Sequence, residues 1–217
     1  GLVAAGAQDQ GWQNSNPGLG GPPYQFTQVI SGDYGHPTSS THTLNMVYSV
    51  YPGFTLLQEN ETGPPVLQLI DFPPETQGVT WMPFILADPD DPDVYYFCAR
   101  HIWRCRRISG ADYAETMMPY DFGVGQGVTA LAISPVDHQY WYAVTNQGYC
   151  HTSTDGGANW TLSEDVGPGA HYFYGTAIVA SPTDRHTCWI GGSGYSNPAV
   201  WTAADAGEHW APVGSGL

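Results

Sequence analysis

Three segments of the sequence align with one another without gaps, and their spacing constrains the fold more than any other feature. They read ILADPDDPDVYYF from Ile85, LAISPVDHQYWYA from Leu131 and IVASPTDRHTCWI from Ile178. Their prolines, Pro89, Pro135 and Pro182, are 46 and 47 residues apart. Each segment joins a run of small apolar residues to an aromatic run through a turn with Pro and Asp. This pattern predicts two neighbouring strands of an antiparallel sheet.

A second repeated element follows two of these segments. Ser153, Asp155, Gly157 and Trp160 fit the pattern S/T-x-D-x-G-x-x-W, and Asp205, Gly207 and Trp210 repeat it 50 residues later with Ala203 in the hydroxyl position. We expect a hairpin turn in which the Asp accepts backbone N–H bonds and the Gly takes a positive φ. The Trp would pack back between sheets. These residues are therefore predicted to have a structural role.

The rest of the chain predicts an all-β fold. The 27 glycines and 18 prolines interrupt nearly every stretch, so no amphipathic run of helical length survives. Short runs of β-branched and aromatic residues predict strands instead. The predicted strands are Gln25–Ile30, Met46–Tyr51, Val94–Cys98, Val128–Ile133, Tyr140–Val144, Ala177–Ala180 and Cys188–Ile190.

A period of 45 to 50 residues with about four strands per unit is typical of a β-propeller blade. The sequence divides into a partial blade at 1–30 and further blades at 31–78, 79–127, 128–174 and 175–217. We therefore expect residues 1–217 to form a single β-propeller domain or part of one, with about four to five blades of a larger ring. A ring closes only when its first and last sheets meet, so we expect this chain to be part of a longer polypeptide.

Several motifs resemble one known group of propellers. They are the S/T-x-D-x-G-x-x-W turns, the aligned Pro-Asp turns, the opening GAQDQG at Gly6–Gly11 and the SGDYG at Ser31–Gly35. Together they resemble the sortilin-type and Asp-box (BNR-like) β-propellers, a group related to the family 74 xyloglucanases. In that group the Asp-boxes lie in peripheral turns and shape the fold. Its sialidases hold a sugar carboxylate with three arginines from different blades. Here four of the five arginines lie within residues 100–107, so the resemblance does not extend to sialidase activity.

The charge of the chain excludes some partners. There are 20 acidic residues, five arginines and no lysine, which gives a formal net charge of −15 at pH 7. Such a surface repels polyanions, so we expect no binding to nucleic acid or to anionic lipid.

No run of about 18 apolar residues is present, and we expect no membrane insertion. The first residues lack the features of a signal peptide, so an export signal would be removed or would lie upstream.

Three aspartates are candidates for catalysis. A glycosidase needs two carboxylates across a cleft, one as general acid and one as base or nucleophile. Asp33, Asp121 and Asp165 lie in predicted loops next to aromatic or glycine residues. The alternative is that each of them forms a turn or is solvated, as expected for most of the 14 aspartates in a chain with so many loops.

The densest acidic run is a candidate calcium site. Asp88, Asp90, Asp91 and Asp93 could offer oxygen ligands to Ca²⁺. The run also aligns with turns that lack the extra acids, so a plain turn is the alternative. We expect no other metal or cofactor, because the eight histidines are scattered.

The four cysteines allow two disulfides. A two-residue turn at His101 and Ile102 would place Cys98 opposite Cys105 on paired strands. Cys150 and Cys188 fall in adjacent predicted blades and could bridge them. The alternative is buried thiols. An even count without a CxxC pair favours an extracellular or cell-surface setting.

Two sequence triplets fit the N-glycosylation acceptor. They begin at Asn60 and Asn159. They would be used only in a secreted eukaryotic protein.

Two functions are compatible with these observations. The first is a secreted, non-catalytic propeller for binding, adhesion or extracellular structural assembly. Its partner would be a protein, a glycan or another copy of the chain, through strand edges and aromatic surface. The second is a glycoside hydrolase similar to the xyloglucanases, acting on a neutral β-glucan. Fold analogy is the whole support for the second function.

Overall fold

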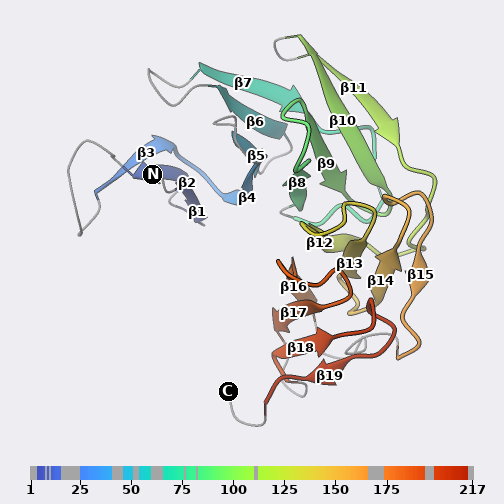
Figure 1. Cartoon of the computed structure of the whole chain (residues 1–217). Helices are drawn as coiled ribbons and strands as arrows, with labels where there is room; N and C mark the ends of the chain where they lie inside the picture. The colour runs from blue at the N-terminus through green and yellow to red at the C-terminus, as the bar shows by residue number, and fades with distance from the viewer. Residues whose placement is uncertain are drawn as a thin grey trace.

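The fold was analysed in a computed structural model of the 217-residue chain. The structure describes residues 4–7, 9, 11–15, 25–40, 46–50, 54–59, 66–75, 77–81, 83–109, 112–165, 174–193 and 198–214. Its strands form one three-stranded and four four-stranded sheets, here called sheets I to V, and no helix occurs within these ranges (Figure 1). The all-β prediction is confirmed.

The strands follow one another in each sheet in chain order. Sheet I consists of β1 (Ala4–Ala7), β2 (Gly11–Ser15) and β3 (Phe26–Ile30). Sheet II consists of β4 (Tyr34–Ser39), β5 (Met46–Val50), β6 (Phe54–Glu59) and β7 (Val66–Asp71). Sheet III consists of β8 (Ile85–Ala87), β9 (Val94–Cys98), β10 (Ile102–Ser109) and β11 (Asp112–Met117). Sheet IV consists of β12 (Val128–Ile133), β13 (Trp141–Thr145), β14 (Cys150–Ser153) and β15 (Thr161–Leu162). Sheet V consists of β16 (Tyr174–Ala180), β17 (Cys188–Ser193), β18 (Val200–Ala203) and β19 (Ala211–Pro212).

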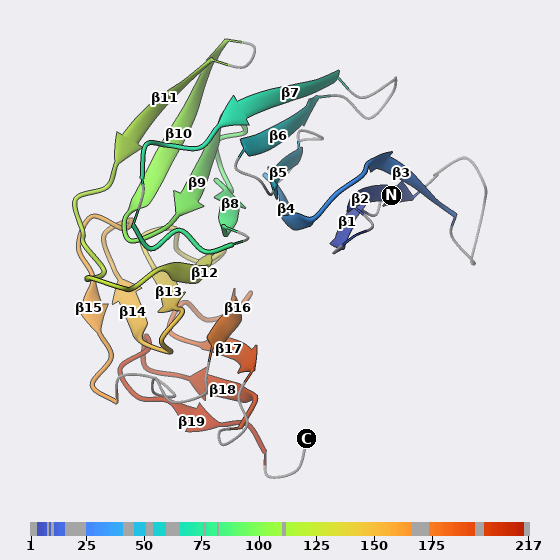
Figure 2. The same ribbon diagram turned by 180° about the vertical axis from the view of Figure 1, so that it is seen from behind.

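The sheets are arranged as the blades of a propeller. The first strand of each four-stranded sheet lies beside the first strand of the next sheet: β4 contacts β8, β8 contacts β12 and β12 contacts β16. The later strands of each sheet lie progressively farther from this inner row (Figures 1 and 2). Both views show the sheets following one another along an arc, with sheets I and V at its two ends. The prediction of four-stranded antiparallel blades is confirmed.

The three aligned segments form equivalent hairpins. They supply the antiparallel pairs β8–β9, β12–β13 and β16–β17. At the start of each turn one side-chain oxygen accepts two backbone N–H bonds: Asp88 from Asp90 and Asp91, Ser134 from Val136 and Asp137, and Ser181 from Thr183 and Asp184. A short side chain that can accept bonds from the following backbone is what such a turn requires. The repeated Ser or Asp before proline therefore fixes the corner of each blade.

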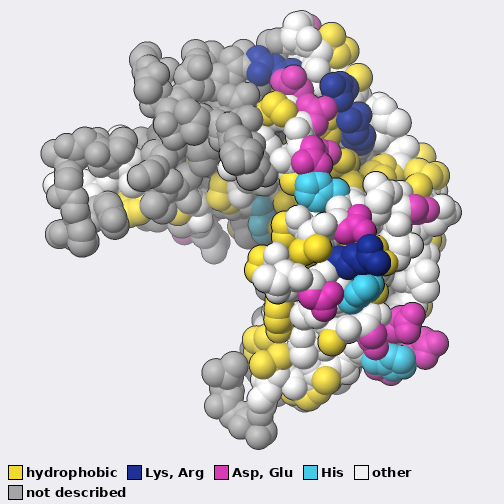
Figure 3. All heavy atoms as spheres, in the orientation of Figure 1, with side chains coloured by type: hydrophobic (Ala, Val, Ile, Leu, Met, Phe, Trp, Pro, Cys, Tyr) yellow, Lys and Arg dark blue, Asp and Glu magenta, His cyan; other side chains and the backbone are white. Residues whose placement is uncertain are grey.

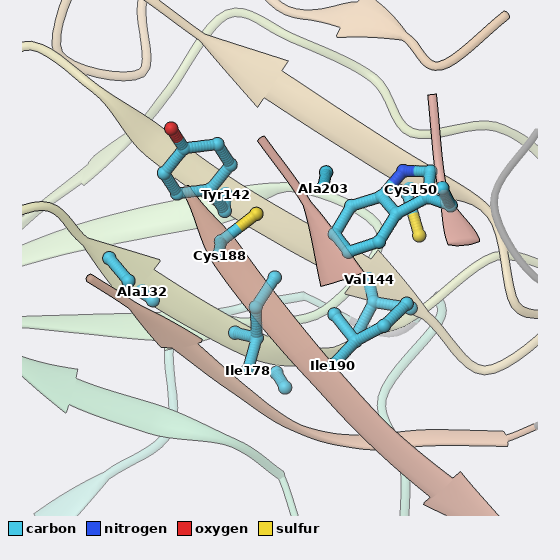
Figure 4. Packing of buried hydrophobic residues seen from close by; sticks show 11 residues of the cluster. Ala132, Tyr142, Val144, Cys150, Ile178, Cys188, Ile190 and Ala203 are labelled. Atoms are coloured by element: carbon cyan, nitrogen blue, oxygen red, sulfur yellow. The ribbon is translucent and has the colours of Figure 1, made fainter. Parts of the chain in front are cut away.

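Three apolar cores lie between consecutive four-stranded sheets. Residues of sheets II and III surround Phe97, and residues of sheets III and IV surround Trp141. Between sheets IV and V, Ala132, Tyr142, Val144 and Cys150 face Ile178, Cys188, Ile190 and Ala203 (Figure 4). Burial of one large apolar side chain contributes about 1.5–3 kcal/mol, so these cores hold neighbouring sheets together.

The predicted Cys98–Cys105 disulfide is wrong. The turn comprises three residues, Ala99 to His101, so Cys98 pairs with Ile102 and Cys105 pairs with Tyr95. The partner of Cys98 is thus three residues away from the predicted one, and this odd shift in register places the two thiols on opposite faces of sheet III. Cys98 lies in the core shared with sheet IV and Cys105 in the core shared with sheet II. Both are buried free thiols.

The second predicted disulfide, between Cys150 and Cys188, is also absent. Both side chains lie in the core between sheets IV and V, but each is a free, buried thiol (Figure 4). Burial raises the pKa of both thiols. The neutral thiols pack as small apolar groups, which is the alternative that the sequence had left open.

Candidate functional site

The turn at residues 153–160, here called the first acid turn, is closed by side-chain hydrogen bonds. Ser153 Oγ donates to Asp155 Oδ1 at 2.8 Å and accepts from the backbone N–H of Gly157 at 2.9 Å. The Asp155 carboxylate accepts from the backbone N and from Nδ2 of Asn159, at 2.9 and 2.7 Å. The bonds from Asn159 and Ser153 hold the pKa of Asp155 below its usual range. The serine and the aspartate therefore stabilise the turn.

The glycine and the tryptophan of this turn are fixed by packing. Gly157 has a φ of +83°, and an added Cβ would lie 3.0 Å from the ring of Trp141. Trp160 is buried, and its Nε1 donates to the carbonyl of Gly157 at 3.0 Å. The turn has the backbone geometry that the sequence pattern predicts.

The turn at residues 203–210, here called the second acid turn, repeats this arrangement with different partners. Asp205 Oδ1 accepts from the backbone N of His209 at 3.1 Å, and Asp205 Oδ2 lies 2.8 Å from His209 Nδ1. Gly207 again has a φ of +83°. The backbone N of Trp210 donates to Asp165 Oδ2 at 3.1 Å. Asp165 thus attaches the second acid turn to the end of sheet IV.

A pocket of about 230 Å³ lies between the two acid turns. Its walls come from β14, the first acid turn, β15, and the second acid turn. The lining residues are Thr152, Thr154, Asp155, Asn159, Thr161, Leu162, Ser163, Glu164, Ala206, Gly207 and Glu208. Ser163 Oγ and the backbone N of Glu164 both donate to the carbonyl of Glu208, at 2.9 and 3.2 Å. These two bonds connect the walls, so the pocket is part of the folded framework.

The chemistry of the pocket is polar and acidic. Five of the eleven lining residues carry a hydroxyl or an amide group, and Leu162 adds an exposed apolar surface. Asp155, Glu164 and Glu208 are its ionisable residues, and none of the lining residues is basic. An anionic ligand would therefore be repelled, whereas a neutral ligand with hydroxyl groups finds donors and acceptors.

An exposed group of ionisable side chains borders the pocket. One ligand atom each of Asp205, Glu208 and His209 lies within 4.8 Å of the others, a spacing that one cation could bridge. His209 Nε2 also lies 3.4 Å from Glu164 Oε2. The hydrogen bond to Asp205 raises the pKa of His209. Figure 3 shows acidic and histidine side chains gathered on the side of the molecule between β15 and β19.

The three aspartates considered for catalysis are bonded to three different parts of the fold. Asp33, between β3 and β4, accepts from the backbone N of Asp9 at 2.8 Å. Asp121, between β11 and β12, binds Arg100. Asp165 binds the second acid turn. Each carboxylate therefore bonds to a residue that is 21 to 45 positions away in the sequence, and no two of the three share a partner in these bonds.

Asp121 takes part in a network that the sequence did not reveal. Arg100 Nε donates to Asp121 Oδ1 at 2.6 Å, and its two terminal nitrogens donate to Asp121 Oδ2 and to Gln77. The hydrogen bond from Arg100 lowers the pKa of Asp121 to about 2. Next to it, His101 Nδ1 lies 2.8 Å from Glu75 Oε2. Burial alone would raise the pKa of Glu75, but the hydrogen bonds from His101 and from the backbone of Gln77 outweigh it, so the pKa is lowered.

The acids of the candidate calcium site have protein partners. Asp88 accepts from the Tyr96 hydroxyl at 2.6 Å, and Asp91 accepts from Arg106 at 2.6 Å. Asp90 pairs with His138. Among the described residues, the acids from Asp88 to Asp93 do not form a group of three with ligand atoms close enough to share one ion. Calcium binding here stays a prediction that the geometry does not support.

One glycosylation candidate lies in the pocket and the other lies outside the described residues. Asn159 is exposed, but its Nδ2 donates to Asp155. A glycan on this nitrogen would compete with that bond. Asn60 falls outside the described ranges.

Known proteins were compared with the chain by sequence and by structure. No known family profile and no curated protein sequence matches it. Solved structures do match. The GH74 enzyme of Niastella koreensis superposes with a TM-score of 0.70 at 14% identity, over 97% of this chain and 35% of that one. The Niastella koreensis enzyme is thus similar to this chain in fold.

Other matches include propellers of different kinds. The GH74 xyloglucanase of Xanthomonas campestris gives a TM-score of 0.62 at 14% identity, over 97% of this chain and 36% of that one. YCF48 from Cyanidioschyzon merolae gives 0.65 at 13% identity, over 92% and 65%. The chain is a β-propeller. At these identities the likeness shows the fold alone, and the propeller spans about a third of the length of the GH74 enzymes it matches.

The described part of the propeller has no helix with the length and hydropathy needed to cross a membrane.

Proposed function

We propose that this chain is a secreted, non-catalytic β-propeller module that binds a partner, in adhesion or in extracellular structural assembly. One observation carries the proposal. Asp33, Asp121 and Asp165 are each held by a structural hydrogen bond, whereas the pocket between the acid turns is open and polar. The pocket therefore offers a place for a ligand, and none of the three aspartates considered for catalysis lines it.

The ligand that fits this pocket best is neutral and rich in hydroxyl groups, such as a sugar residue of a glycan. Thr152, Thr154, Thr161 and Ser163 offer hydroxyls, and Leu162 offers an apolar surface to the face of a sugar ring. The acids that line the pocket accept hydrogen bonds from sugar hydroxyls and disfavour anionic sugars. The pocket volume is below the range typical for drug-sized ligands, so one sugar unit is an appropriate size.

The assignment to the sortilin-type and Asp-box propellers belongs to the same proposal. Its support is the two acid turns, with their shared positive φ at Gly157 and Gly207 and their buried tryptophans. A secreted location is proposed from this resemblance.

A glycoside hydrolase acting on a neutral β-glucan is the second candidate, favoured by the similarity in fold to the GH74 enzymes. The pocket rim places Asp205 and Glu208 close together. Both are exposed, however, and a general acid needs a raised pKa. Burial alone would raise the pKa of Asp205, but the hydrogen bonds from His209 outweigh it and lower that pKa. Non-catalytic binding is therefore the better supported reading.

A binding assay combined with a sugar-release assay tests the proposal. Calorimetric titration with neutral oligosaccharides should give a measurable affinity that Thr154→Ala and Thr161→Ala both weaken. Thr116→Ala is the matched control, because this exposed threonine of β11 lies outside the pocket. Release of reducing ends from a β-glucan would overturn the non-catalytic reading. Affinity that is equal in all three variants would exclude the pocket as the site.

A further inference from the structure

His209, in the second acid turn, lies between two carboxylates. Its Nδ1 is 2.8 Å from Asp205 Oδ2 in the same turn, and its Nε2 is 3.4 Å from Oε2 of Glu164, which follows β15 of sheet IV. Other histidines pair with a carboxylate through Nδ1, namely His101, His138 and His186. At His209 the second ring nitrogen also has an acid beside it.

The contact at Nδ1 has the geometry that orients an imidazole for metal binding. A histidine that binds a metal ion usually donates its other ring N–H to a carboxylate, which fixes the tautomer and the direction of the ring. When Nδ1 of His209 donates to Asp205, the lone pair of the neutral imidazole lies on Nε2, next to Glu164. A cation at Nε2 would take the place of the proton that this nitrogen carries in the imidazolium.

The contact at Nε2 has the spacing of two ligands on one metal ion. Two bonds of about 2.0–2.1 Å to zinc at a tetrahedral angle place their ligand atoms about 3.3–3.4 Å apart. His209 Nε2 and Glu164 Oε2 are 3.4 Å apart. A ligand atom of Glu208 lies within 4.8 Å of those of Asp205 and His209, so this carboxylate is near enough to be a third ligand. The sequence gave no sign of such a group, because Glu164 lies in a different sheet repeat from His209.

The first acid turn shows that closure of the turn needs neither this histidine nor this glutamate. Asn159 has the place of His209, and Ala158 has the place of Glu208. Asn159 donates to the aspartate of its turn from the backbone N and from the side chain, and His209 makes the same two contacts. The shape of the turn therefore explains Nδ1 of His209, but it explains neither Nε2 nor the carboxylate of Glu208.

The ligand types favour zinc over the alkaline-earth ions. Imidazole nitrogen suits zinc and its first-row neighbours, whereas Ca²⁺ and Mg²⁺ prefer sites made of oxygen alone. The two glutamates, Glu164 and Glu208, would neutralise the charge of a divalent cation. The formal net charge of −15 on the whole chain also attracts cations to its surface.

We propose that one Zn²⁺ ion binds between His209 Nε2 and the carboxylates of Glu164 and Glu208, with Asp205 orienting the imidazole. Glu164 follows sheet IV and the other residues belong to sheet V, so the ion connects two blades. The backbone N of Glu164 already donates to the carbonyl of Glu208 at 3.2 Å, which keeps the two acids close before the ion arrives. Zinc binding needs no sugar, so its test is independent of the proposed function.

Calorimetric titration of the 217-residue chain with Zn²⁺ alone tests the site. The wild type should show one saturable site, and His209→Asn should weaken it by more than the about tenfold that loss of an outer-shell partner causes. This variant introduces the asparagine of the first acid turn, which can still donate to Asp205. His186→Asn is the matched control, because His186 lies beside Asp184 in the turn between β16 and β17. It should bind Zn²⁺ as the wild type does.

Thermal unfolding reports the connection between the blades. A ligand that binds only the folded chain stabilises it. Zn²⁺ should therefore raise the melting temperature of the wild type and of His186→Asn, and it should leave that of His209→Asn unchanged. Circular dichroism without metal shows whether each variant is folded.

A second ligand variant and a competition experiment complete the test. The side chain of Glu164 is 76% exposed, so Glu164→Gln should keep the fold and weaken zinc binding. An excess of Ca²⁺ or Mg²⁺ should not displace Zn²⁺, because these ions do not favour imidazole. The proposal is overturned if no saturable site is found, or if His209→Asn or Glu164→Gln binds Zn²⁺ as tightly as the wild type. Displacement of Zn²⁺ by Ca²⁺ would equally overturn it, since the group would then act as a plain acidic surface.

Discussion

Arg100 and Asp121 form a forked ion pair across 21 residues of sequence. Arg100 lies at the turn between β9 and β10, and Asp121 lies in the loop that leads from β11 to β12. The pair therefore attaches the connection between sheets III and IV to the hairpin of sheet III. The same arginine also binds Gln77 and so holds the segment before β8.

Replacement of Asp121 by Asn should lower stability at neutral pH by a modest amount, because the pair is partly exposed. The pKa of this carboxyl is about 2 in the folded protein, below its ordinary 3.8. Its contribution is therefore present above about pH 4 and is lost as the pH falls through about 2. Urea unfolding at neutral pH and near pH 2 measures it. Equal stabilities of the variant and the wild type at neutral pH would contradict this role.

Protonation of His151 should destabilise the propeller in weak acid. This side chain is buried between sheets III and IV beside Phe122, and burial lowers its pKa to about 4. The unfolded chain takes up the proton near pH 6.5, before the folded chain does, so stability falls as the pH drops from about 6.5 to 4. The full loss is about 3 kcal/mol. In His151→Gln, the unfolding free energy should lose this part of its pH dependence, and an unchanged slope would exclude His151 as the cause.

The two acid turns allow a reciprocal test of the serine. Ser153→Ala removes the acceptor of the buried Gly157 N–H and should cost about 1–3 kcal/mol. Ala203 has the equivalent position in the second acid turn, so Ala203→Ser should give a neutral or stabilising change. Thermal unfolding of both variants gives the comparison. A larger loss from Ala203→Ser than from Ser153→Ala would show that the two turns are not equivalent.

Adjacent glycines separate backbone strain from crowding. Gly156 and Gly157 both have positive φ, +71° and +83°. A Cβ at Gly156 would meet nothing closer than 3.7 Å, whereas at Gly157 it would lie 2.8 Å from Met118 and 3.0 Å from Trp141. Both alanine variants should lose about 1–2 kcal/mol from the left-handed backbone. Gly157→Ala should lose about 1–3 kcal/mol more by overpacking, as measured by urea unfolding. Equal losses would contradict the crowded packing.

The cysteines should behave as four inert thiols. All are buried, and burial raises their pKa values, that of Cys105 to about 12. Ellman's reagent should therefore detect no thiol in the native chain and four in urea without reductant. Two or fewer thiols in urea would indicate a disulfide. Addition of a reducing agent should leave the melting temperature unchanged.

The repeated turns could be predicted from sequence because their chemistry is local. Asp88, Ser134 and Ser181 bond to N–H groups two and three residues away, so residue type and spacing determine the structure. The cysteine pairing could not be predicted in this way. The prediction placed the turn at His101 and Ile102, but the turn lies at Ala99 to His101. The partner of Cys98 therefore shifts by three residues, and an odd shift places Cys105 on the opposite face of the sheet.

The candidate site could not be predicted from the sequence either, because residues far apart in the sequence form it. Its pocket combines the first acid turn with residues 206–208, which are about 50 positions away. The partner of Asp165 is a backbone N–H 45 residues later, and a backbone group leaves no trace in composition. The pairing of Glu75 with His101 across 26 residues depends in the same way on how the chain returns to sheet III. Contacts of this kind come from the stacking of blades.

The last strands of sheets IV and V, β15 and β19, have two residues each, and β19 ends at Pro212. Proline lacks the N–H that would extend a ladder, and so short an edge gives an unrelated chain little backbone to pair with. Fibril growth from this perimeter should therefore be disfavoured, even at high protein concentration. An ordered contact at this perimeter is therefore expected to use side chains in place of main-chain hydrogen bonds.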